Sequence, residues 1–216
     1  MHSDLVDKLR CLAIHEESWL VAAADVVDGR HIMRGLLGCP VCHARYPIER
    51  GVADFAVGRD APLVLEAGTM TDDESTAVKL AAMLDLTDPS GYVILVGEWA
   101  RLGAQLREIA PVMVLAVNPP ADVAIGNGVS GVTTLDRIPV AAGSARAIAL
   151  GAPTGAGSRI VDPFAALGAV QPGGRVVGGA RVEMPGDVQL LARDAEHWVG
   201  TRASGAPLIR LVRNPG

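Results

Sequence analysis

The run YVILVGEWARLGAQL (92–106) decides the fold. Its first five residues are apolar in succession, which predicts a strand that is buried on both faces. Leu102, Leu106 and Ile109 follow at helical spacing and predict a helix directly after that strand. A second apolar run, VMVLAV (112–117), predicts the next buried strand. Two buried strands joined by a helix are typical of a parallel α/β unit.

The same alternation continues on both sides of this unit. Thr71 and Glu74 form a capping signature for a helix that ends near Leu86. Further strands are predicted over 131–135, 146–150, 175–182, 197–202 and 207–213, and further helices over 159–170 and near 187–194. The predicted fold class is therefore α/β, with a doubly wound, mostly parallel, Rossmann-like sheet that is covered on both faces.

The N-terminal part of the chain has a different composition. It holds all three cysteines and four of the five histidines, and it shows no helix-period pattern. SWLVAAADVV (18–27) and HIMRGLLG (31–38) predict two strands, with a turn at Asp28-Gly29-Arg30 between them. The sequence thus divides into a small β lobe over 1–55, a linker over 56–71 and a larger domain over 72–216.

Composition excludes several classes of protein. A net charge of −5 and an aromatic content of 3% argue against nucleic acid as a partner. Three cysteines, an odd number, argue against a secreted disulfide framework. The first residues, MHSDLVDKLR, are charged where a signal peptide needs an apolar core, and no apolar run is long enough to insert into a membrane. We expect a soluble cytoplasmic protein.

Two short motifs in the N-terminal lobe predict a metal site. Cys39 and Cys42 form a Cys-x2-Cys knuckle, and Cys11 and His15 form a Cys-x3-His pair upstream. Thiolates and an imidazole are ligands of tetrahedral zinc, and four protein ligands make a structural rather than a catalytic site. His31 and His43 are alternatives to His15 as the fourth ligand. The competing interpretation is a set of ordinary buried thiols without a metal.

The stretch LGCPVCHARYPIERGVADF (37–55) resembles the second half of the small zinc-ribbon proteins that activate tRNA and protein methyltransferases. The matching residues are Cys39, Cys42, Tyr46, Pro47, Ile48, Gly51 and Val52. Ala53 replaces the usual proline, and Ile14 stands where the first knuckle would have its second cysteine. The resemblance implies a zinc ribbon whose first knuckle ends one place later, at His15.

Residues 72–216 resemble a class I S-adenosylmethionine-dependent methyltransferase domain. The resemblance is carried by the strand–loop–helix of 92–106, by GAVQPGGRVVGG (168–179) and by the ending LLARDAEHWVGTRASGAPLIRLVR (190–213). It implies a central first strand, a terminal antiparallel hairpin, and a ligand at the carboxyl end of the first strand.

The positions that carry cofactor chemistry in that family are altered here. The family's loop reads acidic-x-Gly-x-Gly-x-Gly, whereas Leu95 replaces the acid, and Trp99 and Arg101 replace two glycines. Asn118 stands where an acidic residue would accept both ribose hydroxyls, and an amide offers no charged acceptor. Trp99 could fill the space in which the family's glycine-rich loop binds the cofactor, or it could stack on the adenine of the cofactor. A functional cofactor site would use Gly97, Glu98, Trp99 and Asn118.

These departures lead to two hypotheses. The first is a methyltransferase-like protein without catalytic residues, which acts in protein binding or assembly with a protein partner or a second copy. The alternative is an active S-adenosylmethionine-dependent methyltransferase with an altered cofactor site.

Overall fold

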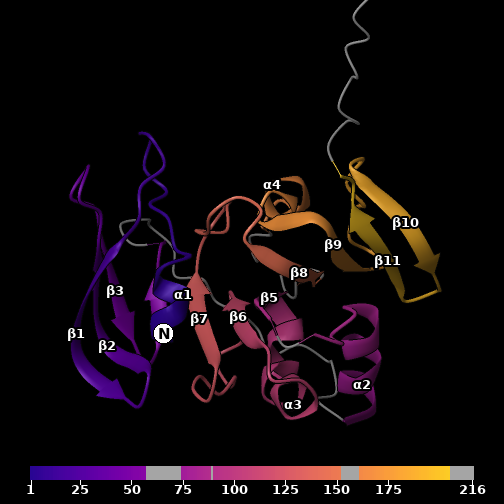
Figure 1. The fold of residues 1–216 in the computed structure, drawn as a ribbon, viewed down its shortest axis with the longest axis horizontal. Coiled ribbons are helices and arrows are strands. Elements are labelled where there is room, and N and C mark those ends of the chain that lie inside the picture. Colours follow the sequence, from indigo (N-terminus) through magenta and orange to yellow (C-terminus); the bar gives the residue numbers. More distant parts are fainter. Residues whose placement is uncertain (57–73, 89, 152–160, 205–216) are drawn as a thin grey trace, which may run out of the picture.

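The computed structural model describes residues 1–56, 74–88, 90–151 and 161–204. In these ranges eleven strands form one mixed sheet in the order β1-β2-β3-β4-β7-β6-β5-β8-β9-β11-β10 (Figure 1). Of the predicted linker 56–71, all but Ala56 lies outside the described residues, and so does the predicted strand 207–213. The predicted capping residue Thr71 is among the residues not described. None of the described helices is long and apolar enough to cross a membrane.

The N-terminal elements are α1 (Ser3–Val6), β1 (Val21–Asp28), β2 (His31–Gly38), β3 (Arg45–Glu49) and β4 (Val52–Asp54). The central elements are α2 (Glu74–Met83), β5 (Tyr92–Val96), the 3-10 helix η1 (Gly97–Leu102), α3 (Gly103–Ile109), β6 (Met113–Val117) and β7 (Val129–Thr133). The C-terminal elements are β8 (Ala145–Leu150), α4 (Pro163–Leu167), β9 (Val170–Gly179), β10 (Val188–Arg193) and β11 (His197–Arg202).

The core of the sheet is parallel, as the apolar strands predict. β5 lies between β6 and β8 and is parallel to both, so the strand order reverses at β5. β11 pairs antiparallel with β9 and with β10. The terminal hairpin predicted from 197–202 and 207–213 is not tested, because its second strand lies outside the described residues. β4 pairs in parallel with β7, with Val52 opposite Gly131, and this ladder joins the N-terminal strands to the parallel strands.

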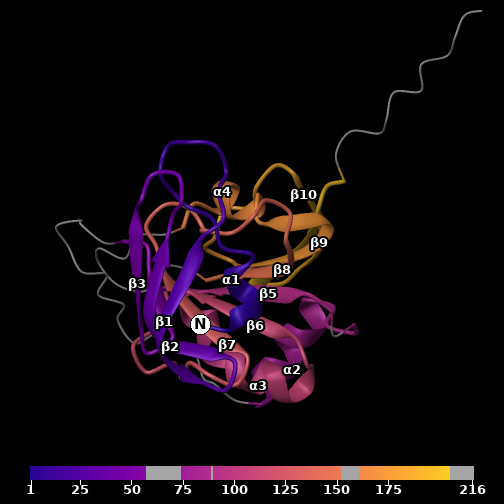
Figure 2. The same cartoon turned by 60° about the vertical axis from the view of Figure 1, so that its left-hand side comes forward.

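Alternate side chains of the parallel strands enter two separate cores. Ile94 lies in one core together with Leu5 of α1, and Figure 2 shows α1 close to these strands. Leu95 lies in the other core together with Leu80 of α2 and Leu106 of α3. The N-terminal segment therefore covers part of the sheet face where a doubly wound fold has helices.

The helical complement is smaller than the sequence predicts. The connections 118–128 and 134–144 contain no helix. The predicted helix at 159–170 is only five residues long in the structure, over 163–167, because Asp162 caps it through the Phe164 amide and β9 begins at 170. The helix predicted near 187–194 is wrong, because β10 occupies these residues and pairs with β11.

Candidate functional site

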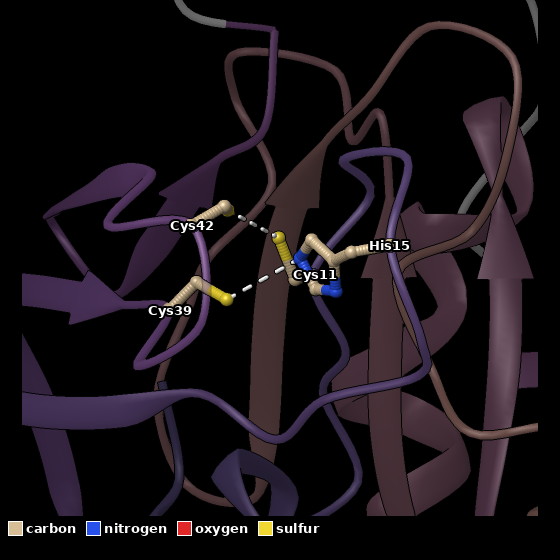
Figure 3. Close-up of side chains that lie close together, drawn as sticks. All are labelled: Cys11, His15, Cys39 and Cys42. Atoms are coloured by element: carbon tan, nitrogen blue, oxygen red, sulfur yellow. Dashed lines mark hydrogen bonds between the residues drawn. The ribbon is translucent and has the colours of Figure 1, made fainter.

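The four predicted metal ligands come together at one end of the N-terminal strands. The Sγ atoms of Cys11, Cys39 and Cys42 and a ring nitrogen of His15 all lie within 4.8 Å of one another. Figure 3 shows the four side chains facing a common point, with 3.4 Å between Cys39 Sγ and His15 Nε2 and 3.6 Å between Cys11 Sγ and Cys42 Sγ. Three thiols and one imidazole form a donor set that suits zinc.

Backbone hydrogen bonds hold the two ligand loops in place. The Cys11 amide donates to the Ser18 carbonyl at 3.1 Å and closes the loop that carries His15. The Cys39 amide donates to the Ala44 carbonyl at 2.9 Å and closes the Cys-x2-Cys knuckle. His15 Nδ1 lies 2.5 Å from the Glu16 carbonyl oxygen, so that Nε2 is the nitrogen directed at the sulfur atoms.

The local electrostatics favour a thiolate at Cys39. Burial alone would raise the pKa of this thiol, but the backbone amides of Cys42 and Val41 donate to the sulfur and lower the pKa to about 6. Burial raises the pKa of Cys11. The Tyr46 hydroxyl lies 3.2 Å from Cys11 Sγ, a contact that the sequence motif did not reveal. Amide and hydroxyl groups that donate hydrogen bonds to the sulfur atoms stabilise a metal-bound thiolate.

The two alternative histidine ligands lie apart from this group. His31 is buried, and its Nε2 accepts a hydrogen bond from the Gly128 amide at 2.9 Å. His43 occupies a left-handed turn with φ of 60° and is not among the clustered donor atoms of the described residues. The geometry thus brings His15, and neither alternative, to the three cysteines.

The second candidate site lies at the carboxyl end of β5. Gly97 has φ of +64°, and a Cβ placed on it would meet nothing within 4 Å. Glu98 is half-buried, and burial raises its pKa. Arg101, at the position of a family glycine, forms an ion pair with Asp122. This loop therefore keeps open space at one glycine position and fills another with an arginine.

Trp99 lies in the core that contains residues of α2, α3 and the parallel strands, and it is 3% exposed. Its Cδ1 is 3.5 Å from the place that a Cβ on Gly151 would take, and its ring centroid is 5.4 Å from that of His197. His197 is itself only 18% exposed in its side chain. No signal in the sequence pairs these two rings, because they are almost a hundred residues apart.

Asn118 is buried at the end of β6 in a left-handed conformation, with φ of 50° and 3% exposure. Its side-chain Oδ1 accepts a hydrogen bond from the Thr134 backbone amide at 2.8 Å. The backbone amide of Asn118 donates to the Val132 carbonyl at 2.8 Å. The side-chain oxygen thus links the ends of β6 and β7.

A groove of about 670 Å³ lies near the carboxyl ends of β4 and β7. Its lining includes Val52, Asp54, Pro119, Pro120 and Thr133, and Asp54 Oδ1 accepts from the Thr133 hydroxyl at 2.7 Å. Asn118-Pro119-Pro120, which ends a strand as expected, also lines this groove in part.

No family model and no curated protein matches this chain. Among solved structures it is similar to an RNA methyltransferase from Salinibacter ruber bound to S-adenosyl-L-homocysteine, at 11% identity and a TM-score of 0.41 over 64% of this chain and 97% of that one. It is also similar to the 16S rRNA N2 G1207 methyltransferase of T. thermophilus, at 17% identity and a TM-score of 0.34 over 80% and 46% of the two chains.

A third similar structure is the geranyl diphosphate C-methyltransferase of Streptomyces coelicolor A3(2), at 16% identity and a TM-score of 0.37. The aligned part covers 55% of this chain and about half, 51%, of that enzyme. The chain is thus structurally similar to S-adenosylmethionine-dependent methyltransferases at low identity.

Proposed function

We propose that this chain is a methyltransferase-like protein that does not use S-adenosylmethionine and that acts as a zinc-stabilised binding or assembly module. Asn118 carries the proposal. A ribose diol needs an acceptor that faces the crevice, whereas the Asn118 oxygen is buried and accepts from the Thr134 amide. The Thr134 amide already occupies one lone pair of this oxygen, and a ligand would reach the other only by displacing the groups that leave Asn118 3% exposed.

The position of Trp99 supports the same proposal. An indole that stacks on an adenine must present a face to solvent before the ligand binds, but Trp99 is 3% exposed and packs against His197. Its burial contributes to the core that also contains residues of α2 and α3. In this protein the residue acts as part of the core.

Zinc fits the donor set of Cys11, His15, Cys39 and Cys42. When bound, the ion would cross-link the loop after α1 to the knuckle between β2 and β3 and would contribute folding free energy. Four protein ligands leave no open position for a substrate. The role we propose for the metal is therefore structural.

The partner in this role is a protein, either a different chain or a second copy. The net charge of −5 argues against a phosphate backbone as the partner. The same composition supports the proposal of a soluble, cytoplasmic protein.

The alternative is an active methyltransferase with an altered cofactor site. One observation favours it, because Gly97 keeps a positive φ and open space of the kind that lets a backbone approach a cofactor. In this alternative Gly97, Glu98, Trp99 and Asn118 would rearrange around the ligand.

Calorimetric titration with S-adenosylmethionine and S-adenosylhomocysteine, on protein whose zinc content has been measured, tests the proposal. We expect no binding heat from folded, zinc-loaded protein. Micromolar binding would overturn the proposal, and Gly97→Ala would then abolish the binding. Gly29→Ala is the matched control, since Gly29 also has a positive φ, of +56°, and no atom within 4 Å of a Cβ.

A further inference from the structure

β1 is the end strand of the sheet, and its outer edge pairs with none of the described strands. Seven of its eight residues are exposed, and Ala22 is the one residue of the strand that packs in part against the core. Val21 is 65% exposed, Val27 54% and the preceding Trp19 68%. A long apolar edge strand presents unpaired N–H and C=O groups that favour pairing with another strand.

A bulge in β1 changes which face of the sheet its side chains lie on. In the ladder with β2, Val21, Ala23 and Val26 pair with Gly38, Leu36 and Arg34, whereas Ala22 and Ala24 pair with Leu37 and Gly35. The ladder skips Asp25. Val21, Ala23 and Val26 therefore share one face although the two valines are five positions apart, an odd number, and Ala22 and Ala24 share the other face.

We propose that β1 pairs antiparallel with β1 of a second copy about a two-fold axis at Ala23. This rests on the proposed assembly role and names its partner. When the two-fold axis is perpendicular to the sheet, residues that pair across it have their side chains on the same face of the sheet. The bulge allows this, because it places Val26 on the same face as Val21. Ala23 then faces its own copy, Ala22 lies opposite Ala24, and Val21 lies opposite Val26.

The charges of β1 favour this antiparallel pairing over a parallel pairing of the two copies in register. Asp25 and Asp28 are its only charged residues. A parallel, in-register pair would place each aspartate beside its own copy, and like charges directly opposite each other are unfavourable. In the antiparallel pair the bulged Asp25 lies beside Val21 of the second copy. Pairing of β1 with the other end strand, β10, would be heterologous and would extend into an open fibre, whereas a two-fold contact closes as a dimer.

Sedimentation of the full, zinc-loaded chain over a range of concentrations tests the pairing. We expect a concentration-dependent dimer. In Val21→Lys/Val26→Lys, like charges meet at two places across the axis, and dimerisation should weaken by at least about tenfold. Val21→Lys/Val26→Glu changes the same positions but sets opposite charges across the axis, so the dimer should persist. Both valines are exposed, and circular dichroism should show an unchanged fold.

Leu191→Lys is the control at the other end strand, where Leu191 is 49% exposed, and it should leave the dimer unchanged. A monomer at every concentration would overturn the inference. So would equal dimerisation of the Lys/Lys and Lys/Glu variants, or loss of the dimer in Leu191→Lys. Titration of the Lys/Lys variant with S-adenosylmethionine separates this result from the proposed function, because cofactor binding would refute that function whether or not a dimer forms.

Discussion

Trp99→Ala should lower the free energy of unfolding by several kcal/mol without creating a cofactor site. The indole is 3% exposed and belongs to the core formed with α2 and α3. A buried tryptophan removes about 150–250 Å² from water, worth about 4–6 kcal/mol at 25 cal/mol/Å². Measured losses for such truncations are about 3–5 kcal/mol, which is the range expected here.

The assay is urea unfolding followed by far-ultraviolet circular dichroism, with calorimetric titration of the same sample with S-adenosylmethionine. Trp19→Ala is the matched control, since Trp19 is 68% exposed and its loss should cost less than about 0.5–1 kcal/mol. The variant should stay unresponsive to the cofactor, because the cavity it opens is lined by apolar core residues. A loss below about 1 kcal/mol, or a gain of micromolar affinity, would refute the assignment of Trp99 to the core.

Three further predictions concern the metal, the tyrosine beside it and the buried amino group of Met1. Removal of zinc by a chelator should lower the Tm, and an unchanged Tm would contradict a structural metal. Tyr46→Phe should weaken zinc binding by about 10–100-fold, because a metal-bound Cys11 thiolate can only accept from the hydroxyl 3.2 Å away, whereas Tyr92→Phe should leave affinity unchanged. Burial lowers the pKa of the Met1 amino group to about 5 and that of His31 to about 4. The unfolded chain therefore binds more protons below pH 8, and urea unfolding should show a stability loss of at most about 4 kcal/mol for the Met1 amine between pH 8 and 5; a flat profile would contradict it.

Local signals were sufficient for several elements. The predicted strands over 31–38 and 197–202 coincide with β2 and β11. The turn between the first two strands was predicted from Gly29, which has φ of +56°. The grouping of the four metal donors also followed from the sequence, because each pair lies within one short loop and the intervening strands form a hairpin.

Elements whose structure depends on distant partners were predicted less well. A helix was predicted near 187–194, but these residues form β10, on which Leu190 and Leu191 are exposed and which is held by its ladder with β11. Ile109 was expected on the packed side of its helix, yet it is 42% exposed because α3 ends there. Hydrophobic spacing alone does not distinguish a short surface helix from an edge strand.

The sequence by itself determined the parallel direction of the central strands, the donor set of the metal site, and the presence of Leu95 and Asn118 where the methyltransferase resemblance predicts acidic residues. Each of these depends on residue type and short-range spacing. Only the tertiary structure decided that β4 adds to β7, that Trp99 points into a core and that Asn118 accepts from Thr134. These contacts join residues far apart in the chain, and which partner a side chain meets is decided by packing rather than by its neighbours in sequence.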